Sequence, residues 1–229
     1  MGDILEIITM NPGTERRFRG VEKSKTFRNI VNAFGLKHKA VLDVGCSYGE
    51  FLIHFGPGST GVTLTQVEVD YGREKGLDVR YGNIESDTFI LEKTYDVIFA
   101  NNIFEHLYSP HHFLIKIKKY LKPNGILILG VPCIPKIVSL VKLPKFRGSF
   151  AVEHINFFTR ETLRKTVERG GWKVREERGF HFSNIFIDTL CNYIYPHFYV
   201  IAVSDSQFKY PERRMKELLG YVDILGPIE

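Results

Sequence analysis

The sequence has little cysteine and no long apolar run. Its 229 residues include three cysteines, Cys46, Cys133 and Cys191, which lie far apart and form no CxxC pair. An odd number of isolated cysteines predicts neither a disulfide framework nor a zinc site. Because no stretch of 18 uncharged apolar residues occurs, we expect no membrane-spanning helix. The amino terminus also lacks the basic region of a secretory signal, so a cytoplasmic protein is expected.

No single charge dominates the chain. Lys and Arg number 31 and Asp and Glu number 26, which gives a formal net charge of +5. This excess is too weak to indicate nucleic-acid binding by itself. Hydrophobic residues make up 44% and charged residues 25%, and this ordinary usage excludes a largely disordered chain.

Apolar, β-branched runs alternate with helical patterns along the chain. We expect strands over seven runs: 40–45, 61–64, 79–81, 95–100, 126–131, 172–176 and 198–203. Repeated strand–helix alternation predicts an α/β fold, with a parallel sheet and helices on both faces. Ligands of such sheets bind beyond the carboxyl ends of the strands.

Several helix ends can be located from capping residues. A helix before the first strand is expected to end at Gly35. A second begins after Ser109, with proline at its first position, and its apolar stripe continues to Leu121. A third begins after Thr159 and ends at Gly170. A short helix is also expected over 212–219.

The strongest local pattern is the run VLDVGCSYGEFL at 41–52. After the acidic Asp43, Gly45 and Gly49 allow positive φ and a close approach of the backbone to a ligand, with a helix expected from Gly49. The spacing is not GxGxxG and no GK[ST] follows, which argues against a dinucleotide site and excludes a P-loop. An acidic residue at the strand end suits a ligand that bears an ammonium group.

This loop resembles motif I of class I S-adenosylmethionine-dependent methyltransferases, in their small-molecule branch (types 11 and 23). Segments 82–84, 95–107, 121–129, 153–163 and 170–174 resemble later parts of that family in the same order. The resemblance implies a Rossmann-like, doubly wound, mostly parallel seven-stranded sheet with a final antiparallel strand. It also implies one domain over 1–204, in which a helical segment at 14–36 covers the sheet, and an appendage at 205–229.

The resemblance further implies S-adenosylmethionine as the cofactor, with two departures in its site. Ser47 stands where the family has glycine, and Thr63 stands where an acid usually binds the ribose. The second strand resembles the cyclopropane-fatty-acid synthase branch, so Thr63 and Glu68 are expected to share the ribose contact. The expected cofactor-binding residues are Asp43, Gly45, Cys46, Ser47, Gly49, Thr63, Leu64, Glu68, Asn83, Ile84 and Asn101.

Methyl transfer is an in-line displacement, so catalysis is mostly alignment, with a base when the acceptor is a hydroxyl. Glu105 and His106 follow the fourth strand, and His154 lies in the expected substrate loop. Each histidine is a candidate base, and a purely structural role stays open for each. Some relatives that methylate catechol-like quinone precursors hold a metal with E-x-x-E-H. Because Asn102 replaces the first acid here, no metal is expected.

Two stretches bear on the acceptor. Residues 133–152 hold Lys136, Lys142, Lys145 and Arg147 and no acid, which predicts either a solvated loop or a rim for an acidic acceptor. The aromatic stretch 180–199 is expected to form core, a homodimer face or an acceptor pocket. We therefore expect O-methylation of a hydroxyl on a small molecule or glycan, including acidic or lipid-linked carbohydrates.

Three other functions stay open. A nucleic-acid methyltransferase is disfavoured, because residues 101–104 hold no proline for gripping a flipped base and Cys133 lacks the partner motif of cytosine chemistry. A lipid C-methylating or cyclopropanating enzyme is suggested by the second strand alone. A non-catalytic cofactor-binding protein would keep the fold without the reaction.

Overall fold

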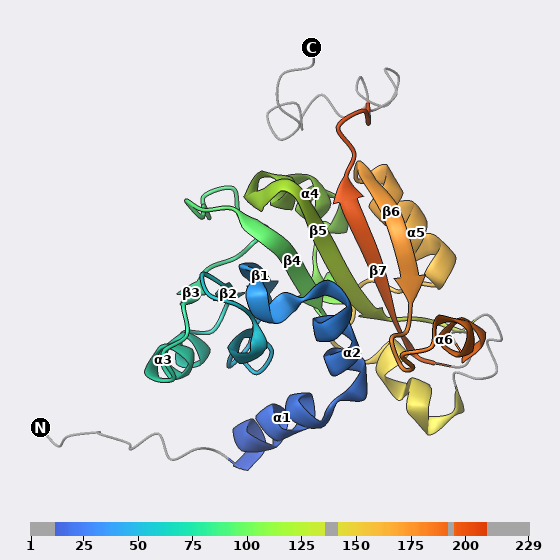
Figure 1. The fold of residues 1–229 in the computed structure, drawn as a ribbon, viewed down its shortest axis with the longest axis horizontal. Coiled ribbons are helices and arrows are strands. Elements are labelled where there is room, and N and C mark those ends of the chain that lie inside the picture. The colour runs from blue at the N-terminus through green and yellow to red at the C-terminus, as the bar shows by residue number, and fades with distance from the viewer. Residues whose placement is uncertain (1–11, 136–141, 192–194, 210–229) are drawn as a thin grey trace, which may run out of the picture.

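The computed structural model describes residues 12–135, 142–191 and 195–209, and its strands form one seven-stranded sheet (Figure 1). The strand order is β3-β2-β1-β4-β5-β7-β6. Every neighbouring pair is parallel except those made by β7, which is antiparallel to both β5 and β6. The predicted mostly parallel sheet with a final antiparallel strand is therefore confirmed. The strands are β1 (Val41–Val44), β2 (Thr60–Thr63), β3 (Val79–Tyr81), β4 (Tyr95–Asn101), β5 (Leu121–Pro132), β6 (Trp172–Arg178) and β7 (His197–Ser204).

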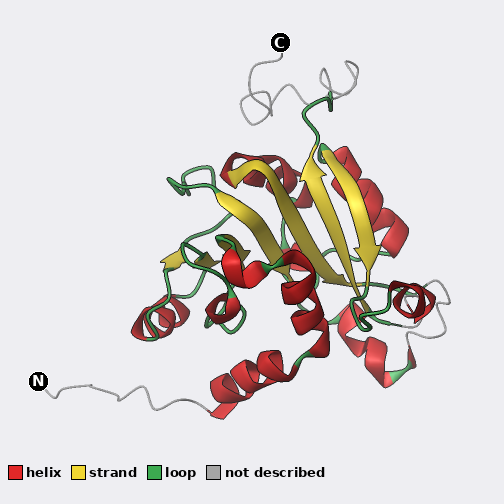
Figure 2. Ribbon diagram, viewed as in Figure 1, coloured by secondary structure: helices red, strands yellow, loops and turns green. Residues whose placement is uncertain are grey.

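Helices lie on both faces of the sheet, as predicted (Figure 2). One face packs against α2, and the other packs against α4 and α5. Because side chains alternate along a strand, Phe99 of β4 joins the core under α2 while its neighbour Ile98 joins the core under α4 and α5. The helices are α1 (Pro12–Lys23), α2 (Lys25–Phe34), α3 (Gln66–Glu74), α4 (Pro110–Lys116), α5 (Arg160–Arg169) and α6 (Ile185–Cys191).

The predicted helix ends are largely confirmed. Gly35 follows α2 with a left-handed φ of 62°, and the Ser109 side chain caps α4. Thr159 caps α5 in a reciprocal capping box with Thr162, a partner that the sequence analysis did not name. Gly170 follows the last residue of α5.

Two local predictions were wrong. No α-helix follows Gly49: the chain makes a single 3₁₀ turn, Leu52–His54, because the Gly-Pro-Gly run at 56–58 leaves too few residues for a helix. The helix expected to continue through Leu121 ends at Lys116, and a 3₁₀ turn fills 117–120. Leu121 instead pairs with Tyr95 and begins β5.

Some predictions fall outside the described residues. These are the helix at 212–219, nearly all of the appendage, Lys136, the side chains of Lys145 and Arg147, and residues 192–194 of the aromatic stretch. The division into residues 1–204 and 205–229 stays a prediction. Among the residues that the structure describes, no helix is long and apolar enough to cross a membrane.

Candidate active site

The glycine loop after β1 is held in a tight, partly left-handed turn. Gly45 and Gly49 have φ values of 73° and 90°, and Ser47, which is not glycine, has 49°. A Cβ atom added at Gly45 would lie 3.1 Å from the Ile103 side chain, which crosses the loop from the end of β4. The backbone therefore needs glycine at this point both for its conformation and for space.

Glu68 links the glycine loop to the end of β2. The Ser47 hydroxyl donates to one carboxylate oxygen of Glu68 at 2.9 Å, and the Thr63 hydroxyl donates to the other. Glu68 lies in the first turn of α3, so the helix supplies the carboxylate that β2 lacks. The structure thus brings together the two residues that were expected to share the ribose contact.

Two buried carboxylates lie beside the same loop. Asp43 is 2% exposed and Glu50 is 4% exposed, and each has one oxygen with no hydrogen-bond partner among the described residues. Burial raises the pKa of Asp43 well above its usual range, and the nearby Glu50 raises it further. The other oxygen of Glu50 accepts from Arg17 of α1. Sequence reasoning did not include Glu50, although it directly follows Gly49.

The remaining expected cofactor residues differ in what they present. The Cys46 side chain is buried against Gly61 in the core beside α3, so only its backbone faces the loop. Leu64 is 60% exposed at the end of β2, Ile84 is buried, and Asn83 is exposed. Asn101 is half-buried at the end of β4.

Glu105, His106 and His154 form one compact group. The chain leaves β4 in a 3₁₀ turn, Phe104–His106, that buries Glu105 to 1% exposure. Glu105 Oε1 lies 4.0 Å from His106 Nε2 and 3.9 Å from His154 Nε2, and the two rings meet edge to face. Neither Glu105 oxygen has a hydrogen-bond partner within the described part of the chain. Burial raises the pKa of Glu105 to about 7.

Backbone hydrogen bonds hold this group together across a long stretch of sequence. The Glu105 carbonyl accepts from the amides of Ile155 and Asn156, and the Asn156 side chain donates to the Leu107 carbonyl. His106 Nδ1 lies 3.0 Å from the Glu153 carbonyl. A carbonyl only accepts, so Nδ1 carries the proton and Nε2 of neutral His106 keeps a lone pair.

The three side chains of this group could also hold a metal. One potential ligand atom from each residue lies within 4.8 Å of the others. Two imidazoles and a carboxylate are a donor set that suits a transition metal or zinc. The absence of a metal therefore stays a prediction.

A second histidine pair, His181 and His197, lines a cavity of about 460 Å³. Sequence reasoning missed both residues. His197 lies at the start of β7, and its Nε2 is 2.8 Å from Asn102 Oδ1. His181 Nδ1 is 3.2 Å from the Thr26 hydroxyl of α2, and its ring stacks on Tyr195.

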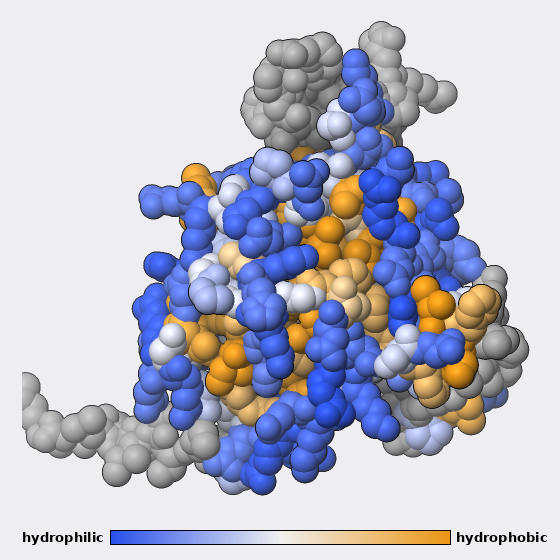
Figure 3. All heavy atoms as spheres, viewed as in Figure 1, coloured by the Kyte–Doolittle hydropathy of each residue, from blue (hydrophilic) through white to orange (hydrophobic). Residues whose placement is uncertain are grey.

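The aromatic stretch 180–199 divides between core and surface. Phe180, Phe198 and Tyr199 are buried, which agrees with the prediction that part of this stretch forms core. Phe182 and Phe186 are exposed, and Figure 3 shows hydrophobic residues at α6 as well as over the middle of the sheet. In the basic stretch, the Lys142 side chain is exposed.

Known proteins agree with this fold. A family model described as "Methyltransferase domain" matches residues 16–177, more than half of the chain. The ubiquinone biosynthesis O-methyltransferase of Actinobacillus pleuropneumoniae serotype 7 (strain AP76) is 28% identical over 189 residues, covering 71% of this chain and 80% of that protein.

Solved structures give the same fold at low sequence identity. A SAM-dependent methyltransferase from Thermotoga maritima superposes with a TM-score of 0.58 at 16% identity, covering 83% of this chain and 94% of that one. The CcbJ methyltransferase from Streptomyces caelestis gives 0.60 at 14% identity, with 80% and 90% coverage. From its family match and its fold, the chain belongs to the methyltransferase domain family and is a class I S-adenosylmethionine-dependent methyltransferase.

Proposed function

We propose that this enzyme methylates a hydroxyl oxygen, with the Glu105–His106–His154 group removing the proton. The observation that supports this most is the buried Glu105 carboxylate between two imidazoles after the end of β4, which accepts no hydrogen bond from any described residue. Perturbed titratable groups at the ligand-binding edge of a sheet favour acid–base chemistry. Relatives named as O-methyltransferases support an oxygen acceptor.

The residues around the glycine loop fit the cofactor. Asp43 and Glu50 are buried beside the loop with two unpaired oxygens, which calls for a cationic group such as the ammonium of the methionine part. Thr63 and Glu68 would hold the ribose hydroxyls, because a carboxylate already oriented by two hydroxyl donors is fixed in position. When bound, S-adenosylmethionine supplies an electrophilic methyl group.

The adenine would lie between the ends of β2 and β3. Leu64 presents an exposed apolar side chain there, and Ile84 gives a buried floor. Asn83 accepts from the Glu85 amide through its side-chain oxygen, which fixes the turn and leaves its amide nitrogen for a base. At the loop itself, Gly45, Cys46, Ser47 and Gly49 would contribute mainly backbone, as would Asn101 at the end of β4.

The two histidines differ in their fitness as the base. Because His106 Nδ1 donates to the Glu153 carbonyl, its Nε2 is free to accept a proton, and the resulting cation would lie 4.0 Å from Glu105. Burial lowers the pKa of His154 and His106 lowers it further, and these effects outweigh the smaller opposite effect of Glu153, so a proton on His154 is disfavoured. We therefore assign the base to His106, with Glu105 stabilising its cation and His154 packing against it.

The acceptor itself is predicted at the level of chemical class. A small molecule or glycan with a free hydroxyl fits the proposal, and a charged or lipid-linked part would meet the basic stretch that holds Lys142. The relatives' name, ubiquinone biosynthesis O-methyltransferase, makes phenolic hydroxyls a second class to test. A homodimer through the exposed face of α6 also stays a proposal.

Mass-spectrometric detection of a transferred methyl group tests the function. The enzyme is incubated with S-adenosylmethionine and separate phenol, carbohydrate and amine panels. We expect products in a hydroxyl panel that disappear in His106→Ala, while S-adenosylhomocysteine still raises the melting temperature of that variant. Methylation of amines alone would overturn the O-methylation proposal.

A further inference from the structure

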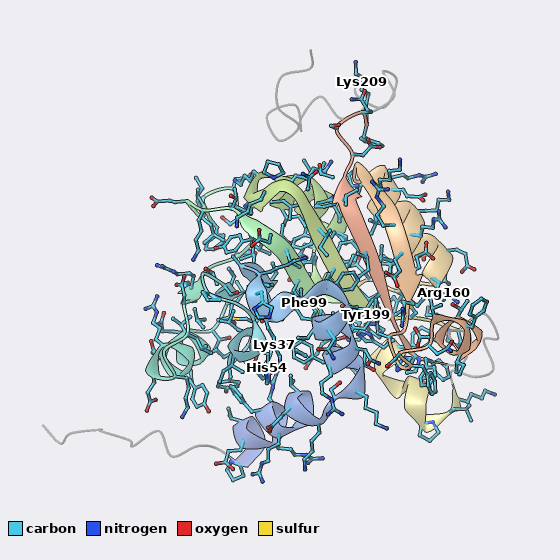
Figure 4. All side chains as sticks on the ribbon, viewed as in Figure 1. Lys37, His54, Phe99, Arg160, Tyr199 and Lys209 are labelled. Atoms are coloured by element: carbon cyan, nitrogen blue, oxygen red, sulfur yellow. The ribbon has the colours of Figure 1, made fainter. Side chains whose placement is uncertain are left out.

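The cavity that holds His181 and His197 lies under α1 and α2, next to the end of β4. Its volume is about 460 Å³, and its wall includes Asn101 and Asn102, where β4 ends. Tyr199 of β7 forms part of the wall on the face of the sheet that α2 covers (Figure 4). The same strand end leads into the Glu105 turn, so the cavity and the proposed base follow the same strand.

The charges in this cavity cancel. Among its described lining residues, Arg17 and Glu50 carry the charges, and they pair with each other at 2.8 Å. The unpaired oxygen of Glu50 adds negative rather than positive potential near the floor. An anion placed here would meet no free cation among the described lining residues.

Burial disfavours the charged form of both imidazoles of the cavity. Burial lowers the pKa of His197 to about 3, and burial also lowers the pKa of His181. His197 Nε2 faces Asn102 Oδ1, and Asn102 has a left-handed φ of 55°, which is strained for a residue that is not glycine. The remaining wall is aromatic and hydroxyl-bearing, with Phe27, Thr26 and Tyr199.

We propose that this cavity binds the hydroxyl-bearing ring of the methyl acceptor, that this ring is uncharged, and that His197, fixed by Asn102, positions it. Neutral imidazole and hydroxyl groups can donate to or accept from ring hydroxyls, and the aromatic residues cover the ring faces. This inference rests on the proposed function and adds to it a site and a charge preference. A charged part of the acceptor would lie outside the cavity.

Two probes of equal ring size test the charge preference. 4-Hydroxybenzyl alcohol is neutral, and 4-hydroxybenzoate carries a carboxylate near neutral pH. Their binding to the enzyme saturated with S-adenosylhomocysteine is measured by ligand-observed NMR, with methyl glucoside and glucuronate as the sugar counterparts. We expect the neutral member of at least one pair to bind about tenfold or more tightly than its anion, because the cavity offers the anion no unpaired cation among its described lining residues.

Substitutions then place the binding in the cavity. Gly20 lies in the wall, and a Cβ added there meets nothing within 4 Å, so Gly20→Phe introduces a ring at a position with space for its first side-chain atom. We expect Gly20→Phe and His197→Phe to weaken binding of the neutral probe about tenfold, and His197→Asn to weaken it less. Gly148→Phe is the matched control, because Gly148 is also open but does not line the cavity.

The outcomes separate this inference from the proposed function. Equal or tighter binding of the anions, no binding of any probe, or binding unaffected by both Gly20→Phe and His197→Phe would overturn the cavity assignment. Unchanged affinity for S-adenosylhomocysteine in these variants shows that the cofactor site is intact. If the neutral probes bind as expected but no hydroxyl compound is ever methylated, the cavity assignment stands and the O-methylation proposal fails.

Discussion

The two histidine pairs of this enzyme lie near the same sheet edge but in opposite surroundings. His106 and His154 flank Glu105, whose neighbours Phe104 and Leu107 belong to the core under α4 and α5. His181 and His197 line a cavity whose residues Phe27 and Tyr199 belong to the core under α2. The same side-chain type therefore meets a carboxylate on one face of the sheet and neutral partners on the other.

This difference indicates that the two histidine pairs have different functions. An imidazole beside a carboxylate gains a stabilised cation and can take up a proton. His197, with a pKa lowered to about 3, cannot hold a proton near neutral pH and can only orient a partner through hydrogen bonds. We infer that the first pair serves the chemistry and the second pair serves binding.

Substitutions in the two histidine pairs should have the largest effects, and these effects should fall on different kinetic constants. We expect His106→Ala to lower kcat by roughly 10²–10⁴-fold, the usual contribution of a general base, with little change in KM. We expect His197→Phe to raise the acceptor KM about tenfold, with a smaller change in kcat. Steady-state kinetics on any acceptor found by the mass-spectrometric screen measure both. Equal effects of the two substitutions on kcat would contradict the inference that one pair serves the chemistry and the other serves binding.

The second expected effect is on the pH dependence of stability, through Glu105, which lies beside the His106–His154 pair only. Because burial raises the folded pKa of Glu105 from 4.5 to about 7, its contribution to stability is fully present below pH 4.5 and is lost as pH rises through 7. Glu105→Gln should therefore gain on the parent over this range, by about 3 kcal/mol at most. Urea unfolding at several pH values checks this. A constant difference between parent and variant would contradict the buried, proton-binding Glu105.

Most of the fold could be predicted because its signals are local. β-Branched runs marked every strand, and capping residues such as Ser109 and Thr159 marked helix starts. The helix expected after Gly49 does not form. The Gly-Pro-Gly turn at 56–58 follows too soon after Gly49 for an α-helix, so only a 3₁₀ turn forms. Leu121 joined a strand because pairing with Tyr95 outweighed its place in a helical stripe.

The candidate site was predictable where it follows a parallel strand. Glu105 and His106 follow β4, so the rule that ligands bind beyond carboxyl ends found them. His181 follows β6, which runs parallel to β5, and the same rule could have found it. His197 escaped because β7 is antiparallel, which brings its amino end to the ligand-binding edge. The position of Glu50 could not be predicted from the sequence, because its contact with Arg17 joins residues 33 positions apart.

The smallest expected effect concerns the proposed cofactor site. Ser47 keeps a left-handed φ of 49° and donates to Glu68 at 2.9 Å, so Ser47→Ala removes that hydrogen bond and leaves the backbone strained. We expect S-adenosylhomocysteine to bind about fivefold more weakly, which corresponds to the roughly 1 kcal/mol that a typical hydrogen bond contributes. Ser47→Gly should recover part of this loss, because glycine relieves the strained φ. Calorimetry measures both, with the neutral ring probe as the comparison. If Ser47→Ala weakened the ring probe as much as the cofactor product, the cavity and the cofactor site would not be separate.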